Sequence, residues 1–222
     1  MDIEKYKQLL NEVKPYSAQI VAVSKTKPVE DVIKLHKAGH RIFGENKVQE
    51  LIPKYEAAPH DIEWHLIGHL QTNKVKFIAS FIGMIQSVDS LKLLSEINKQ
   101  AERNNRVIKC LLQVSISEEE TKFGISIGDL YQLLESPEYA AMKNIQISGL
   151  MGVATHTIDE VQIEKEFGLI KGLFDHIKKK YFADNDSFRE LSLGMTSDYK
   201  LALKHGATLI RIGSLIFGER VY

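Results

Sequence analysis

Short apolar runs alternate along the chain with longer segments in which apolar residues recur every three or four positions. The runs are typical of buried strands, and the periodic segments are typical of helices packed on one face. The predicted strands are Ile20–Ser24, Arg41–Phe43, Glu63–Ile67, Met84–Ser87, Ile108–Ser115, Gln146–Gly152, Glu190–Leu193 and Leu209–Ile212. Eight strands that alternate with helices predict an α/β fold of the (β/α)8, or TIM barrel, type, with a doubly wound open sheet as the alternative.

The helical segments have recognisable limits. Apolar residues repeat at helical spacing over Asp159–Lys179, with an aspartate that could cap the start, and again over Ser90–Asn104. Pro28 suits the first turn of a helix, and Gly39 suits the position where that helix ends. Residues 1–16 are expected to form an extra helix that closes the bottom of the barrel.

Composition narrows the class of protein. The 222 residues contain no linker-like stretch, so we predict one domain over residues 1–222. Lys+Arg and Asp+Glu both total 29, and this balance argues against a nucleic-acid or anionic-membrane partner.

The single cysteine, Cys110, lies in an apolar run and is expected to be a buried core residue in a reducing compartment. With no signal-type start and no apolar stretch long enough to span a bilayer, the expectation is a soluble cytoplasmic protein.

The most informative motif is VAVSKTKP, residues Val21–Pro28, in which an apolar strand ends on Lys25. Function in a barrel of this type sits at the carboxyl ends of the strands. A lysine that is partly desolvated there shifts its pKa readily and can form a Schiff base. The alternative interpretation is a solvated lysine at a strand end, and the motif alone does not decide between the two.

A phosphate site is predicted after the last two strands. GMTSD supplies Gly194 and the hydroxyl of Thr196, and RIGS supplies Gly213 and Ser214, each near an expected helix start. Backbone N–H groups at helix starts bind phosphate, and these two loops are a frequent phosphate site in such barrels. Ordinary Gly-Ser turns are the alternative for each motif taken alone.

Two further features carry charge or metal-binding potential. Arg211 is a full charge within the apolar strand TLIRIG, and an arginine pointing into a barrel needs a planar acceptor or an anion.

A metal site could be suggested by Glu63, His65 and His69, but their spacing fits no familiar zinc pattern. We expect no metal here and expect the histidines to orient loops through hydrogen bonds.

Taken together, VAVSKTKP, FGEN, WHLIGHLQTNK, SLGMTSD and RIGSLIFGER occur in order along the chain. In this respect the sequence resembles the pyridoxal phosphate homeostasis proteins, the YggS/PROSC family, over almost its whole length. The resemblance implies a single barrel like the N-terminal domain of alanine racemase. It also implies that pyridoxal 5′-phosphate (PLP) is bound as an imine to Lys25.

The resemblance extends to individual positions around the cofactor. It places Asn46 of FGEN beside the ring and Arg211 facing the pyridine nitrogen. It assigns the phosphate region to Met195, Thr196, Gly213 and Ser214. Lys122 matches a further lysine that the family uses near the site. Two positions depart from the family pattern, because Lys47 stands where many members have an aromatic residue and Thr196 stands where serine is usual.

The predicted function follows from Arg211 as well as Lys25. Arginine does not give up its proton, so a hydrogen bond from Arg211 would keep the pyridine nitrogen unprotonated and the ring a poor electron sink. In alanine racemase a second base comes from another domain, for which this chain leaves no residues. We predict a non-catalytic carrier that buffers and delivers PLP to PLP-dependent apoenzymes, as a monomer or weak dimer. The alternatives are a one-domain PLP-dependent racemase or lyase, and a phosphosugar enzyme in which Lys25 is catalytic.

Overall fold

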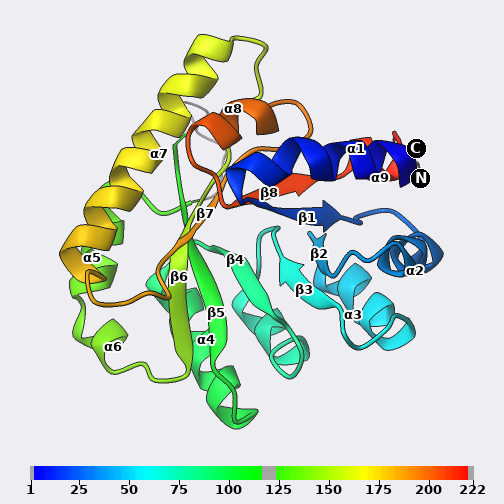
Figure 1. Ribbon diagram of the computed structural model, residues 1–222. Helices are drawn as coiled ribbons and strands as arrows, with labels where there is room; N and C mark the ends of the chain where they lie inside the picture. The colour runs from blue at the N-terminus through cyan, green and yellow to red at the C-terminus, as the bar shows by residue number, and fades with distance from the viewer. Residues whose placement is uncertain (1–2, 117–123, 220–222) are drawn as a thin grey trace.

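In the computed structural model, which describes residues 3–116 and 124–219, eight parallel strands close into a barrel in sequence order (Figure 1). The strands are β1 (Gln19–Val23), β2 (Ile42–Glu45), β3 (Glu63–Leu66), β4 (Met84–Val88), β5 (Ile108–Val114), β6 (Ile145–Gly152), β7 (Glu190–Ser192) and β8 (Leu209–Ile212). Direct pairing of β1 with β8 closes the sheet, so the predicted barrel is confirmed and the open sheet is excluded.

Helical segments surround the barrel. They are α1 (Ile3–Val13), η1 (Lys14–Tyr16), α2 (Val29–Lys37), α3 (Val48–Ala57), η2 (Thr72–Phe77), α4 (Leu91–Arg103), α5 (Ile127–Glu135), α6 (Pro137–Ala140), α7 (Glu160–Tyr181), α8 (Tyr199–Lys204) and α9 (Ser214–Phe217). Asp159 caps α7 by accepting from the N–H groups of Val161 and Gln162, as predicted. Gly39 has φ +98° just beyond α2, a conformation that glycine adopts readily. None of the described helices is both long enough and apolar enough to span a membrane.

The hydrophobic residues separate into two layers. A large cluster lies between the outer faces of the strands and the helices, and it includes Cys110, whose thiol pKa is raised by burial. A smaller cluster inside the barrel contains Val21, Met84, Leu111, Met151 and Leu209. Alternate residues of each strand face opposite sides of the sheet, and this alternation produces the two layers.

The first helix differs from its prediction. We expected residues 1–16 to close the barrel bottom, but α1 packs against β1 and α9 in the outer layer (Figure 1). The buried side chains of α1, Tyr6, Leu9 and Val13, belong to the large hydrophobic cluster and hold the helix there. A second difference is smaller: Pro28 is the N-cap residue of α2 and not a residue of its first turn.

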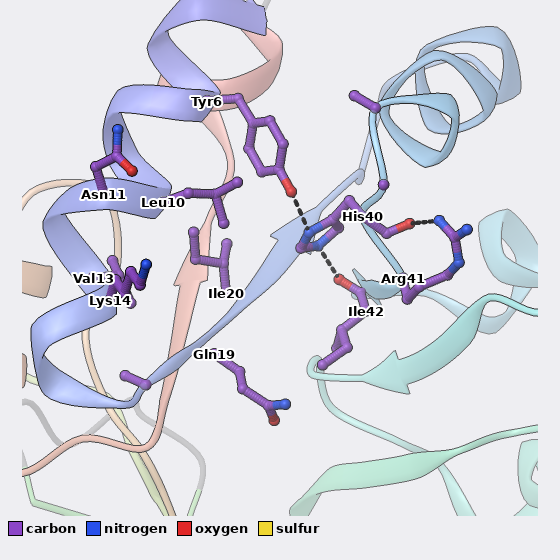
Figure 2. Close-up of a pocket in the computed structure, with 13 residues that line it drawn as sticks. Tyr6, Leu10, Asn11, Val13, Lys14, Gln19, Ile20, His40, Arg41 and Ile42 are labelled. Carbon is purple, nitrogen blue, oxygen red and sulfur yellow. Dashed lines mark hydrogen bonds between the residues drawn. The ribbon is translucent and has the colours of Figure 1, made fainter.

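A cavity of about 470 Å³ lies between α1 and the amino ends of β1 and β2 (Figure 2). Its polar side chains bond to one another: the Tyr6 hydroxyl donates to Nδ1 of His40 at 3.0 Å, and Nε2 of His40 donates to the Ile42 carbonyl at 2.7 Å. Burial lowers the pKa of His40 to about 4, so the ring is neutral near pH 7. The cavity is therefore a packing feature under α1.

Candidate functional site

A larger cavity, of about 700 Å³, lies at the carboxyl ends of the strands. Its lining residues are Val23, Lys25, Lys27, Asn46, Ile67, Met151, Val153, His156, Met195, Thr196, Ser197, Arg211, Gly213, Ser214, Gly218 and Glu219. All seven residues predicted for the cofactor site are among them. The fold thus brings together residues that lie up to 189 positions apart, from Lys25 to Ser214.

Lys25 follows β1 on a turn that is fixed on both sides. The buried hydroxyl of Ser24 donates to Oε1 of Glu45 at 2.6 Å. Thr26 has φ +63°, which is unfavourable for a β-branched residue. Its N–H donates to Oε2 of Glu50 at 2.8 Å, and this bond holds the turn in place. The backbone that carries Lys25 is therefore held by neighbouring carboxylates.

A buried ion pair lies directly behind this turn. Nζ of Lys54 is 2.5 Å from Oε1 of Glu45 and donates to the Ser24 carbonyl at 2.8 Å. Burial raises the pKa of Glu45, and the hydrogen bond from Lys54 opposes that rise. The pair joins the end of β1 to the end of β2, where the chain continues to Asn46.

The amide of Asn46 has an unsatisfied acceptor. Its Oδ1 atom is buried and has no hydrogen-bond partner within the described part of the chain. Gly68, in the loop after β3, approaches the Asn46 backbone so closely that a Cβ there would lie 2.4 Å from the Asn46 carbonyl oxygen. A glycine is required at this contact, and it keeps Asn46 against the cavity wall.

The predicted phosphate region lies at the starts of two short helices, and Gly213 is the N-cap residue of α9. Asp198 is the N-cap residue of α8, so Thr196 and Ser197 lie in the turn before the helix. Oδ1 of Asp198 accepts from the Met195 N–H at 2.5 Å and closes that turn. Because α8 has six residues, its dipole contributes little, and hydroxyl groups are the main candidate donors on this wall.

Arg211 points into the barrel as predicted and is 4% exposed. Its Nη1 donates to the Ser192 hydroxyl at 2.6 Å and its Nη2 donates to the Gly152 carbonyl at 2.8 Å. These acceptors are neutral oxygens and not an anion. Burial lowers the pKa of Arg211 to about 10, which leaves the guanidinium charged near pH 7. Arg211 also lines the cavity, so its guanidinium can donate to a bound ligand.

Several lining residues were missed by the sequence prediction. His156 follows β6, and inspecting the end of that strand as well would have identified it. Lys27, which belongs to the predicted VAVSKTKP motif, also lines the cavity and donates from Nζ to the carbonyl of Glu219, beyond α9, at 3.0 Å. Lys122 lies outside the described residues.

The two candidate metal-site histidines have different surroundings. His65 belongs to β3 and is buried, so it does not orient a loop as we expected. His69 lies in the following loop and its Nδ1 is 3.0 Å from Oδ2 of Asp89. Within the ranges 3–116 and 124–219, no group of three His, Cys, Asp or Glu residues is arranged to hold a metal ion.

Comparison with known sequences identifies the relatives of this chain. Residues 3–221 match the family model described as alanine racemase, N-terminal domain. The chain is 38% identical over 206 residues to the pyridoxal phosphate homeostasis protein of Aquifex aeolicus, covering 92% of this chain and 88% of that protein. It is 40% identical over 203 residues to the protein of the same name from Helicobacter pylori, covering 90% and 87%.

Solved structures show the same relationship. The structure of PipY from Synechococcus elongatus without PLP has a TM-score of 0.90 and 34% identity, covering 97% of this chain and 99% of that one. The structure of PipY with PLP bound has a TM-score of 0.87 and 33% identity. Alanine racemase from Bartonella henselae, at 16% identity and a TM-score of 0.70, shares the fold. The chain therefore belongs to the pyridoxal phosphate homeostasis protein family.

Proposed function

We propose that this protein binds PLP in the 700 Å³ cavity, holds it through Lys25, and acts in PLP homeostasis without robust catalysis. One observation carries the proposal. A lysine, a pair of hydroxyl-bearing loops and a buried arginine converge on one cavity, in a chain one-third identical to a protein whose structure contains PLP.

The residues of the cavity suit the chemical groups of PLP. The cofactor presents an aldehyde, a phosphate, a phenolic oxygen and a pyridine nitrogen. Lys25 would supply the amine, and the hydroxyls of Thr196 and Ser214 would donate to the phosphate. The amide of Asn46, whose Oδ1 has no partner in the described residues, would face the ring substituents. Each polar part of the cofactor thus has a candidate partner.

Arg211 would set the electronic character of the bound ring. When bound, PLP supplies an electron sink whose strength depends on protonation of its pyridine nitrogen. Arg211 can only donate, because its guanidinium stays charged. It would hold that nitrogen as an acceptor and keep the sink weak. This supports a carrier over the racemase or lyase alternative, and the curated relatives are named for homeostasis.

We extend the proposal to partners and location. PLP-dependent apoenzymes would receive the cofactor, and the protein would work in the cytoplasm as a monomer or weak dimer. In the described part of the chain the exposed large apolar residues come from several different elements, which supports a monomer; they are Leu10, Tyr16, Phe77, Val107, Ile158, Val161 and Leu169. Sedimentation of the purified protein over a concentration series tests the assembly state.

The spectrum of the purified protein tests cofactor binding. We expect a visible absorption band from the Lys25-linked cofactor, which borohydride removes by reducing the linkage. Peptide mapping should then place the pyridoxyl mass on the Lys25 peptide. The Lys27→Ala variant, which changes a second lining lysine, should retain the band, while Lys25→Ala should lose it. Protein without a band after incubation with PLP would favour the phosphosugar alternative, and a mass on Lys27 would overturn the assignment.

A further inference from the structure

A continuous hydrogen-bonded chain of polar side chains crosses the barrel interior between the cofactor cavity and the opposite rim. It consists of Arg211 on β8, Ser192 on β7, Gln86 on β4, and His65 and Glu63 on β3, and we call it the barrel network. The first four residues are buried, and Glu63 is partly exposed at the amino end of β3. Such a chain of polar residues is unusual in a barrel interior, which bulky apolar side chains normally fill.

The network is continuous at hydrogen-bond distance. Nη1 of Arg211 is 2.6 Å from Oγ of Ser192, which is 2.7 Å from Oε1 of Gln86. Nε2 of Gln86 is 2.8 Å from Nδ1 of His65. Nε2 of His65 is 3.3 Å from Oε1 of Glu63, which ends the network.

The donors of the network all point the same way. Arg211 can only donate, so the Ser192 hydroxyl accepts from it and gives its own proton to Gln86. The Gln86 amide nitrogen then donates to Nδ1 of His65, which must be unprotonated. His65 therefore carries its proton on Nε2 and donates to the Glu63 carboxylate. Hydrogen bonds that all run in the same donor-to-acceptor direction strengthen one another. The network also has opposite charges at its two ends, the Arg211 guanidinium and the Glu63 carboxylate.

Turning the Gln86 amide over would break this order. The amide nitrogen would then donate to Ser192, whose hydroxyl would accept twice and have no acceptor for its own proton within the network. The Glu63 carboxylate only accepts, so it holds the His65 proton on Nε2 and leaves Nδ1 as an acceptor. That Nδ1 selects the observed orientation, because it accepts from an amide nitrogen and repels an amide oxygen. His65 thus determines which way the acceptor beside Arg211 faces.

We propose that His65 is a positioning residue of the cofactor site, which acts through Gln86 and Ser192 to fix the Arg211 guanidinium at the cavity wall. The inference rests on the proposed function, because the fixed guanidinium matters as the donor to the pyridine nitrogen. Glu63, at the far rim, completes the role by holding the His65 proton on Nε2.

The first test uses protein without cofactor. Nitrogen-15 NMR of the histidine ring should show His65 neutral, with its proton on Nε2. The Nη signals of Arg211 should be resolved by slow rotation, and in His65→Leu they should collapse or shift. His40→Phe removes a different buried histidine and should leave them unchanged. A proton on Nδ1 of His65, or Arg211 signals indifferent to His65→Leu, would overturn the inference even if PLP does not bind.

The second test uses PLP-loaded protein. We expect His65→Leu to shift the absorption maximum and weaken PLP binding roughly tenfold, the scale of one lost hydrogen bond to a charged group. His65→Asn offers an acceptor to Gln86 and should recover part of both effects. His40→Phe again serves as the control for loss of stability. Wild-type absorption and affinity in a folded His65→Leu protein would contradict the proposal.

A third variant keeps the test independent of whether His65→Leu folds. Gln86→Glu is nearly isosteric and offers only acceptors, so it should move the His65 proton to Nδ1 or charge the ring. We expect the same change at Arg211 and a shifted absorption maximum. A band absent from every protein, including wild type, would refute PLP binding, while the NMR result would still decide whether the network fixes Arg211.

Discussion

The ammonium of Lys54 lies 2.5 Å from Oε1 of Glu45, and the same ammonium donates to the Ser24 carbonyl at 2.8 Å. Both side chains are buried, and they join the residues that immediately precede Lys25 and Asn46. Two strand ends that carry cofactor-site residues are thus linked by one ion pair. The other oxygen of Glu45, Oε2, has no hydrogen-bond partner in the described residues, so the carboxylate depends strongly on Lys54.

The first prediction concerns this ion pair. Lys54→Met should lower the free energy of unfolding by about 3–5 kcal/mol, because it leaves a buried carboxylate without its cation. The double variant Lys54→Met, Glu45→Gln should recover part of that loss. Urea denaturation measures both, and Lys37→Met, which changes an exposed lysine, serves as the control. A loss no larger than that of the control would contradict the prediction.

The same variant should show a specific dependence on pH. Lys54 opposes the burial that raises the Glu45 pKa, so removing it raises that pKa further. A raised carboxyl pKa means that the folded state binds more protons, and stability then falls as pH rises above about 4.5. The deficit of Lys54→Met relative to wild type should therefore be small in acid and grow toward neutral pH. A deficit that does not vary with pH would place its origin in packing.

The second prediction concerns His40. Its folded pKa, about 4, lies below the ordinary value of 6.5, so the unfolded chain takes up the proton first. The contribution of His40 to the free energy of unfolding should be complete above pH 6.5. It should fall as the pH decreases toward 4, with a loss of about 2 kcal/mol at pH 5. His40→Gln removes the titrating group and should flatten this part of the profile. An unchanged profile in His40→Gln would assign the pH dependence to other groups.

Much of the fold could be predicted because it is recorded in local patterns. Each predicted strand overlaps an observed one, and the cap at Asp159 is set by interactions within four residues. The position of α1 could not be predicted in this way. It depends on the contacts of α1 with β1 and with α9, which lies about 200 positions away in the sequence and meets α1 only in the assembled barrel.

In the candidate site, too, some features could be predicted from local sequence and others depend on the assembled barrel. Strand-end position and family resemblance identified the seven predicted residues, which line one cavity. The partners behind them were not predictable, because they depend on the register between strands. His65 lies in a predicted strand, but only the pairing of that strand with β4, His65 opposite Met84, brings its ring to Gln86 in the barrel interior. Lys54 reads as an ordinary helix lysine until α3 packs it beneath Ser24.

The third prediction concerns the phosphate of PLP. Thr196→Ala and Ser214→Ala each remove a candidate donor to a charged acceptor, so each should weaken PLP binding about tenfold to a hundredfold. Thr196→Ser keeps the hydroxyl and should bind nearly as wild type. Absorbance titration with PLP and with pyridoxal separates the phosphate contribution, because pyridoxal should bind far more weakly. Equal affinity for the two compounds would refute the phosphate region.

The last prediction is that the protein does not turn over amino acids. Amino acids should perturb the spectrum of the bound cofactor, since exchange of the amine partner of PLP requires no loss of the α-hydrogen. In deuterium oxide, L-alanine and other amino acids should therefore keep that hydrogen, as proton NMR would show. Fast deuterium incorporation that Lys25→Ala abolishes would favour the racemase or lyase alternative.

Substitution of Arg211 tests the reason for this inactivity. Arg211→Glu would place a carboxyl group where the guanidinium now lies, and an acid facing the pyridine nitrogen favours its protonation and a stronger electron sink. When that variant is loaded with PLP, any slow exchange of the amino-acid α-hydrogen for deuterium should become faster. Arg211→Gln removes the positive charge without supplying an acid and should raise exchange less. Because both variants disturb the bonds to Ser192 and Gly152, loading is measured first by absorbance. If loaded Arg211→Glu shows no increase, the weak sink is not the limiting factor, and the availability of a base for the α-hydrogen becomes the explanation to test.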